Sequence, residues 1–152
     1  MGIHMATAAT PPKKLRASTS SVRAPFVAAA SAADVIFLDL EDAVAPDDKE
    51  QARKNIIEGL NDIDWGDKTM MIRINGLDTH YAYRDVIEVL ENCPRLDMIL
   101  IPKVEHPDQI REVDGSIERI VGRTGDDRPL WLMPILESAL GIENALSIAR
   151  AG

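Results

Sequence analysis

The sequence predicts an α/β protein in which short apolar strands alternate with amphipathic helices. Four apolar runs begin near residues 35, 69, 97 and 130, a repeat of about 30 residues that matches one β-α unit. A segment with helical periodicity follows each run. The first run, Val35–Leu40, has no alternation of polar and apolar residues, which is typical of a strand buried on both faces of a parallel sheet. We therefore expect a parallel sheet, either doubly wound or closed as a barrel.

Composition limits the possible classes of protein. The chain has 152 residues, enough for one domain with a proper core and too few for two domains of ordinary size. No apolar run is long enough to span a membrane, and a net charge of −8 argues against a non-specific nucleic-acid binder. The single cysteine, Cys93, excludes an internal disulfide and favours a reducing, cytoplasmic location. Beside a proline, it is expected to be an ordinary buried thiol.

The N-terminal region differs in charge from the rest of the chain. We expect residues 1–25 to be a disordered or tag-derived arm, and residues 26–152 to be a partial β/α barrel domain. The first 33 residues carry a formal charge of +4 and the remainder carries −12. The small-residue run at 26–33 is expected to end a short helix below the first strand.

The other elements follow from periodicity and turn signals. A helix should open at Asp47 and Asp48 and run to about Leu60, with acidic residues at its positive N-terminus. Further strands are expected at 69–74, 96–101 and 130–136, further helices at 81–90, from His106 onward and at 141–149, and an exposed connection at 122–129. The helix after His106 should bury Ile110, Val113, Ile117 and Ile120.

A closed barrel is favoured over a doubly wound sheet. No Gly-x-Gly-x-x-Gly or phosphate-loop motif follows any of the expected strands. The expected fold is therefore a TIM-type (β/α)8 barrel, with about its first half clearly represented in this chain.

Charged side chains follow every expected strand. In a barrel the carboxyl ends of the strands share one mouth, where chemistry takes place. A purely structural strand end would need only small polar caps, although a salt-bridge network at the rim is an alternative. The residues at these ends are Asp39, Glu41 and Asp42, then Arg73 with Asn75, Lys103 with Glu105, and Glu137 with Ser138.

This mixture of charges suits enolate chemistry. Carboxylates from two strand ends can hold a hard divalent cation such as Mg²⁺. The arginine between them offers a planar fork to a carboxylate or an enolate oxygen. A metal and an arginine aimed at one developing oxyanion would stabilise an enolate, in enolisation or in cleavage of a carbon–carbon bond beside a carbonyl.

At these residues the sequence closely resembles the HpcH/HpaI aldolase and citrate lyase β-subunit family, and within it the malyl-CoA lyases. The resemblance is carried by four stretches in the family's order and spacing, namely residues 31–49, 73–79, 101–105 and 135–142. It implies a metal-dependent lyase that uses Mg²⁺, or Mn²⁺ in its place, to join or separate an acyl-CoA enolate and a 2-oxo acid. Malyl-CoA giving acetyl-CoA and glyoxylate is the expected case.

The resemblance also implies roles for individual residues. Glu137 would be a metal ligand, and Arg73 would bind the oxo-acid and stabilise the enolate. Glu41 and Asp42 would line the same mouth, through metal-bound water or by orienting Arg73, and Lys103 would bind substrate at the rim. A homotrimer or homohexamer is expected, with neither nucleic acid nor membrane as a partner.

Two departures from the family pattern leave alternatives open. Family members are considerably longer, and a second metal-binding aspartate and a lid aspartate would lie beyond Gly152. The family's first strand is not legible at residues 20–26, which affects the CoA pocket. The chain is therefore expected to be a piece of a longer enzyme or a half barrel that pairs with another chain. Citramalyl-CoA, β-methylmalyl-CoA or a citryl thioester are alternative substrates, and a non-catalytic acidic association module is the alternative class.

Overall fold

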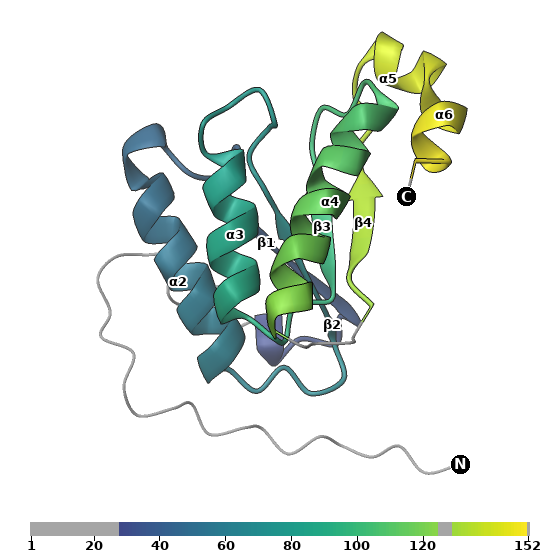
Figure 1. The fold of residues 1–152 in the computed structure, drawn as a ribbon. Coiled ribbons are helices and arrows are strands. Elements are labelled where there is room, and N and C mark those ends of the chain that lie inside the picture. Colours follow the sequence, from purple (N-terminus) through teal and green to yellow (C-terminus); the bar gives the residue numbers. More distant parts are fainter. Residues whose placement is uncertain (1–27, 125–128, 152) are drawn as a thin grey trace, which may run out of the picture.

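A single parallel sheet with helices on one face forms the body of the protein (Figure 1). The computed structural model describes residues 28–124 and 129–151. Its strands are β1 (Val35–Asp39), β2 (Thr69–Arg73), β3 (Met98–Ile101) and β4 (Trp131–Pro134), and they pair in sequence order. A doubly wound sheet reverses its strand order at a switch point, whereas this sheet continues in one direction. The order is that of consecutive units of a β/α barrel, as the sequence predicted.

Three long helices cover one face of the sheet. They are α2 (Lys49–Asp62), α3 (Ala82–Asn92) and α4 (Pro107–Thr124), and Figure 1 shows them side by side across the strands. A short 3₁₀ helix, η1 (Pro46–Asp48), precedes α2, and two short helices, α5 (Ala139–Glu143) and α6 (Ala145–Ala149), follow β4. Among the described residues, no helix is long and apolar enough to cross a membrane.

The core lies between these helices and the sheet. Because side chains alternate along a strand, the residues that share a face with Ile72 turn toward the helices. Ile72 and Ile99, which are neighbours in the register of β2 and β3, are completely buried. The isoleucines and valine expected to form the buried stripe of the helix after His106 are buried as predicted. Burial of this continuous apolar layer supplies the main driving force for folding.

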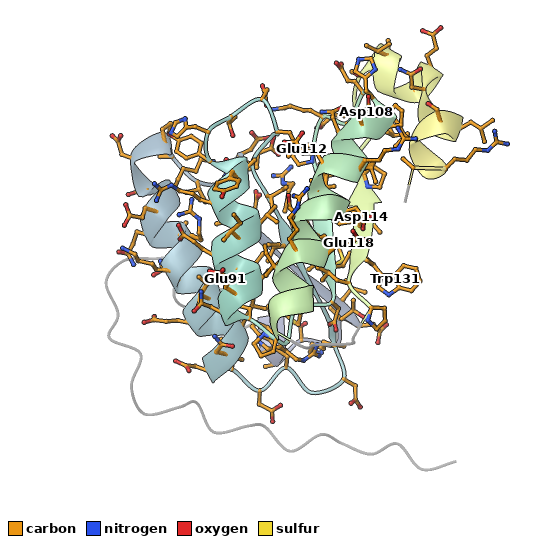
Figure 2. All side chains as sticks on the ribbon, in the orientation of Figure 1. Glu91, Asp108, Glu112, Asp114, Glu118 and Trp131 are labelled. Carbon is orange, nitrogen blue, oxygen red and sulfur yellow. The ribbon has the colours of Figure 1, made fainter. Side chains whose placement is uncertain are left out.

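The opposite face of the sheet is exposed along its two outer strands, whereas Met71 and Leu100 on the inner strands are buried. Val35 and Phe37 on β1 are 48% and 52% exposed, and Trp131 and Met133 on β4 are 63% and 43% exposed. Figure 2 shows Trp131 projecting from β4 away from the helical layer. The prediction that the first strand is buried on both faces is therefore wrong for the described residues. In a closed barrel this inner face is filled by side chains from strands across the barrel.

Several element boundaries differ from the sequence-based expectation. The helix at α4 extends through Thr124, so the connection expected at 122–129 starts later, and residues 125–128 lie outside the described part of the chain. The expected strand at 130–136 is shorter, as β4. The arm at 1–25 and the start of the small-residue run at 26–33 also lie outside the described residues; within that run, only Ala28 and Ala29 are helical.

The helix expected at 141–149 is two helices with a break at Asn144. The side-chain amide of Asn144 donates a hydrogen bond to the carbonyl oxygen of Glu105 at 2.8 Å, which anchors the break to the loop after β3. Gly141 lies so close to this loop that a Cβ atom would stand 2.4 Å from the carbonyl oxygen of Val104. A side chain at residue 141 would push α5 away from the end of β3, so glycine is required by this close approach.

Candidate functional site

The carboxyl ends of β1 and β2 hold an arginine and an aspartate in direct contact. Asp39 and Arg73 are partners in the parallel register, so their side chains lie on the same face of the sheet. The Nε and Nη2 atoms of Arg73 donate to the two carboxylate oxygens of Asp39 at 2.8 Å and 2.6 Å. This is the two-pronged geometry in which an arginine and a carboxylate bind most specifically.

Glu41 extends the cluster across three strands. Its Oε2 atom lies 3.1 Å from Nη1 of Arg73, and its Oε1 atom lies 3.0 Å from Nζ of Lys103. The residue is only 5% exposed. The lysine contact is an ion pair without well-directed hydrogen-bond geometry, so buried Oε1 is left without a hydrogen bond. One buried carboxylate therefore links the ends of β1, β2 and β3.

The charges of this cluster reinforce one another. The hydrogen bond to Asp39 raises the pKa of the Arg73 guanidinium above its usual range, against the opposing effect of burial. Burial raises the pKa of the Asp39 carboxyl, but the hydrogen bonds from Arg73 and from the backbone amides of Glu41 and Ala43 outweigh it, so the pKa is lowered. The contact with Glu41 raises the pKa of Lys103. Asp39, Arg73 and Lys103 therefore all stay charged near neutral pH.

Lys103 also connects the cluster to Glu137. Its backbone has φ +54, the left-handed region, which is uncommon for a residue with a side chain. In this conformation its N–H donates to Oε1 of Glu137 at 2.9 Å. Glu137 is exposed and follows β4. Lys103 therefore contacts carboxylates from two different strand ends, Glu41 through its side chain and Glu137 through its backbone N–H.

The other residues expected at strand ends have different places. Asp42 is exposed, and in the part of the chain that the structure describes it forms no ion pair; its charge acts on Arg73 and Lys103 from a longer range. Ser138 caps α5 by accepting from the amide of Gly141 at 3.1 Å. The structure thus brings Glu41, Arg73 and Lys103 into direct contact and adds Glu137 through a backbone N–H.

The described residues do not form a metal site by themselves. Nowhere in ranges 28–124 and 129–151 are three or more His, Cys, Asp or Glu side chains placed to hold a metal ion. Glu137 offers one exposed carboxylate, and one of its oxygens already accepts the Lys103 N–H. Mg²⁺ keeps several waters and is usually held by one or two carboxylates, so Glu137 fits as one ligand and does not make a complete site by itself. The role of Glu137 as a metal ligand stays a prediction.

A buried polar network beneath the mouth was not foreseen from the sequence. Asp85 is completely buried and accepts from both the backbone and side-chain N–H groups of Asn75, at 2.9 Å and 2.6 Å. Its other oxygen accepts from Nε of Arg53 at 3.0 Å. This network fastens the loop after Arg73 to α2 and α3. A signal was present, because Lys49 and Arg53 precede Ile56 at helical spacing and so place two cations on an apolar stripe.

The fold and the site together define a class. A parallel sheet in sequential order, with an arginine, a lysine and carboxylates gathered at its carboxyl ends, is the arrangement of a β/α barrel protein with a charged mouth. The chain belongs to the HpcH/HpaI aldolase/citrate lyase family, whose profile matches residues 18–152.

Several characterised relatives share this region. The chain is 56% identical over 127 residues to the L-malyl-CoA/beta-methylmalyl-CoA lyase of Cereibacter sphaeroides, covering 81% of this chain and 39% of that protein. It is 38% identical over 122 residues to the citrate lyase subunit beta of Leuconostoc mesenteroides subsp. cremoris, covering 78% of this chain and 39% of that subunit. The chain therefore spans about two fifths of the length of the curated relatives it matches.

Solved structures share the same fold. RipC from Yersinia pestis matches with a TM-score of 0.59 and 34% identity over 82% of this chain and 50% of that chain. The malate synthase of Haloferax volcanii matches with a TM-score of 0.66 over 77% of this chain and 36% of that chain, at 21% identity. At that identity the malate synthase supports the fold alone.

Proposed function

We propose that the protein acts as a carbon–carbon lyase on a 3-hydroxyacyl-CoA such as malyl-CoA, releasing acetyl-CoA and glyoxylate. The observation that carries this proposal is the guanidinium of Arg73, held on one side by Asp39 and on the other by Glu41 at the mouth of the sheet. An arginine fixed in this way is a preorganised donor for an anionic oxygen. The identity to relatives named as malyl-CoA lyases supports the choice of substrate.

The reaction balances without a further reactant. The hydroxyl group of malyl-CoA loses its proton, and the bond between the hydroxyl-bearing carbon and the thioester-side methylene breaks. The electron pair moves into the thioester to form the acetyl-CoA enolate, while the hydroxyl carbon becomes the aldehyde of glyoxylate. Protonation of the enolate gives acetyl-CoA. Arg73 would bind the carboxylate or the developing carbonyl of the oxo-acid, Glu41 would hold its orientation, and Lys103 would attract the anionic substrate at the rim.

We propose Mg²⁺, or Mn²⁺ in its place, as the cofactor. Its ligand set would need groups beyond Glu137, since the described residues do not complete one. We also propose a cytoplasmic location, which rests on the single cysteine, and a homotrimer or homohexamer, which rests on the resemblance.

Glyoxylate release tests the proposal directly. Purified protein is incubated with malyl-CoA, and glyoxylate is trapped as its phenylhydrazone and followed by absorbance. We expect release that stops with EDTA and returns with added Mg²⁺. If EDTA does not stop glyoxylate release, the proposed metal cofactor is wrong. If protein of established intact mass and oligomeric state releases no glyoxylate, the proposed function is wrong.

A citryl thioester is the second candidate substrate, because the citrate lyase subunit beta of Leuconostoc mesenteroides subsp. cremoris is also a relative at 38% identity. Parallel assays with malyl-CoA, β-methylmalyl-CoA, citramalyl-CoA and citryl-CoA separate the candidates by their kcat/KM values. If none of these is cleaved, a non-catalytic association module becomes the better account, and the exposed sheet face with Phe37 and Trp131 is its candidate contact surface.

A further inference from the structure

A buried lysine lies directly behind the charged mouth. Lys49 is the first residue of α2 and is only 7% exposed. Its Nζ atom donates to the carbonyl oxygens of Leu40 and Glu41 at 2.7 Å and 2.6 Å, and it stands 5.8 Å from the centre of the Tyr81 ring. Among the described residues, no carboxylate lies within 4.0 Å of it. Lysine is rarely buried without a charged partner, because removing an ammonium from water is costly.

The contacts of Lys49 fasten the turn that carries Glu41. The backbone N–H of Glu41 donates to Asp39 at 2.9 Å, and its carbonyl oxygen accepts from the amide of Val44 at 3.1 Å. Both of these partners belong to the same acidic turn. Lys49 adds a tie from outside the turn, and it fastens two consecutive carbonyl groups to the start of α2. The Glu41 carboxylate, fixed in this way, reaches both Arg73 and Lys103.

We infer that Lys49 is a positioning residue for Arg73. It acts through Glu41: the ammonium fixes the carbonyl groups of the turn, and the turn holds the Glu41 carboxylate against the guanidinium. The expected effect of Lys49 on turnover rests on the proposed function, whereas its expected effect on the Glu41–Arg73 contact does not. An apolar residue of similar length could fill the same space without burying a charge, so packing alone does not account for a lysine at this position.

Three variants test this role. Lys49→Met removes the ammonium and keeps most of the stem, Lys49→Arg keeps a cationic donor, and Lys54→Met is the matched control. Lys54 is on the same helix and 59% exposed, and its one ion pair among the described residues is with exposed Glu50. If Lys49→Met does not fold, Lys49→Gln replaces it, because its amide can still donate to one carbonyl.

The first measurement needs no substrate. The ¹⁵N–¹H NMR signal of Arg73 Nε–H, assigned with Arg73→Lys, reports the hydrogen bond to Asp39 directly, and it responds through the same guanidinium to the contact between Nη1 and Glu41. We expect Lys49→Met to shift or broaden this signal in the same direction as Glu41→Gln. We expect Lys49→Arg to restore most of it and Lys54→Met to leave it unchanged. An unchanged signal in Lys49→Met, or in Lys49→Gln if that variant is used, overturns the inference even when the variant is less stable.

The second measurement is steady-state kinetics. We expect Lys49→Met to lower kcat by about 10-fold to 100-fold, since a small misplacement of a binding group can have this effect. The KM for the CoA thioester should stay within about twofold, because Lys49 lies away from the rim, and Lys49→Arg should recover part of the loss. A loss of kcat that follows stability alone and is not recovered by arginine contradicts the positioning role. If the wild-type protein releases no glyoxylate, the proposed function fails, and the Arg73 signal still decides this inference.

Discussion

The two ends of the sheet each carry an arginine–aspartate pair, and they use it differently. At the carboxyl ends, Arg73 and Asp39 pair at 2.6 Å. At the amino ends, Arg95 and Asp97 also pair at 2.6 Å. There, Arg95 also donates to the carbonyl oxygens of Gly66 and Lys68, and Asp97 accepts from the amide of Met70. The amino-end pair therefore satisfies backbone groups, as expected for a feature that stabilises the fold.

At the carboxyl ends, the arginine meets further charge. Arg73 contacts a second carboxylate, Glu41, whose other oxygen faces Lys103. Asp39 also accepts hydrogen bonds from the backbone amides of Glu41 and Ala43. What distinguishes this end is the further charge around Arg73, which preorganises the guanidinium for an incoming anion. Similar residue types thus serve stability at one end of the sheet and a candidate site at the other, in agreement with the general division in β/α barrels.

The largest loss of stability is expected at the buried Asp85–Arg53 pair, which fastens the loop after β2 to the helices. Asp85→Ala should lower the free energy of unfolding by about 3–5 kcal/mol, because it removes the buried partner of Arg53. Urea unfolding followed by circular dichroism measures this change. Asp108→Ala, in an exposed pair on α4, is the control and should change stability by less than about 0.5 kcal/mol. Equal effects of the two variants would contradict the distinction between buried and surface pairs.

The same arginine-to-alanine substitution at each end of the sheet tests whether the two arginine–aspartate pairs have different roles. Arg73→Ala should reduce glyoxylate release from malyl-CoA by about 10²-fold to 10³-fold, the usual loss for one oxyanion-binding group. Arg95→Ala should leave kcat/KM within about twofold and lower the unfolding free energy by about 1 kcal/mol, because it removes a partly exposed ion pair with Asp97 and hydrogen bonds to backbone carbonyl groups. If Arg95→Ala reduces kcat as strongly as Arg73→Ala, the division between the two ends is wrong.

Acidification should weaken the carboxyl-end pair. The pKa of Asp39 is lowered in the folded protein below its ordinary value of 3.8, so its contribution to stability is complete above that value and is lost as the pH falls through the folded pKa. Asp39→Asn should therefore flatten the dependence of unfolding free energy on pH below about pH 4. Urea unfolding at a series of acidic pH values measures the slope. An unchanged slope would show that Asp39 does not contribute to it.

The smallest expected effect is the reactivity of the Cys93 thiol, which lies near the amino ends of the strands. Burial raises the pKa of Cys93 to about 12, and the residue is 2% exposed. We expect no reaction with Ellman's reagent at neutral pH in the folded protein and one equivalent after unfolding. Rapid reaction of the folded protein would contradict the burial of this thiol.

Local patterns in the sequence determined much of this protein. The repeat of apolar runs and helical stripes predicted the α/β class and a parallel sheet, and the lack of a nucleotide-binding motif favoured a barrel, whose strands pair in sequence order. Because parallel strands end at the same edge, the sequence also predicted that residues following different strands, such as Glu41, Arg73 and Lys103, would gather together. These features depend on the hydrophobic period and on the direction of the strands, and both can be read from residues close together in the sequence.

Only the tertiary structure decided which groups are buried and what they touch. Asp85 looks like an ordinary surface charge of a helix, yet it is buried against the loop after β2. Lys49 lies on an apolar stripe, but only the structure shows that its ammonium binds the carbonyl groups of Leu40 and Glu41. Phe37 looks like a core residue, yet the described residues leave it half exposed. The physical reason is that the burial of a side chain depends on which other element packs over it. A periodic pattern shows which face of an element is apolar, but not which element packs against that face.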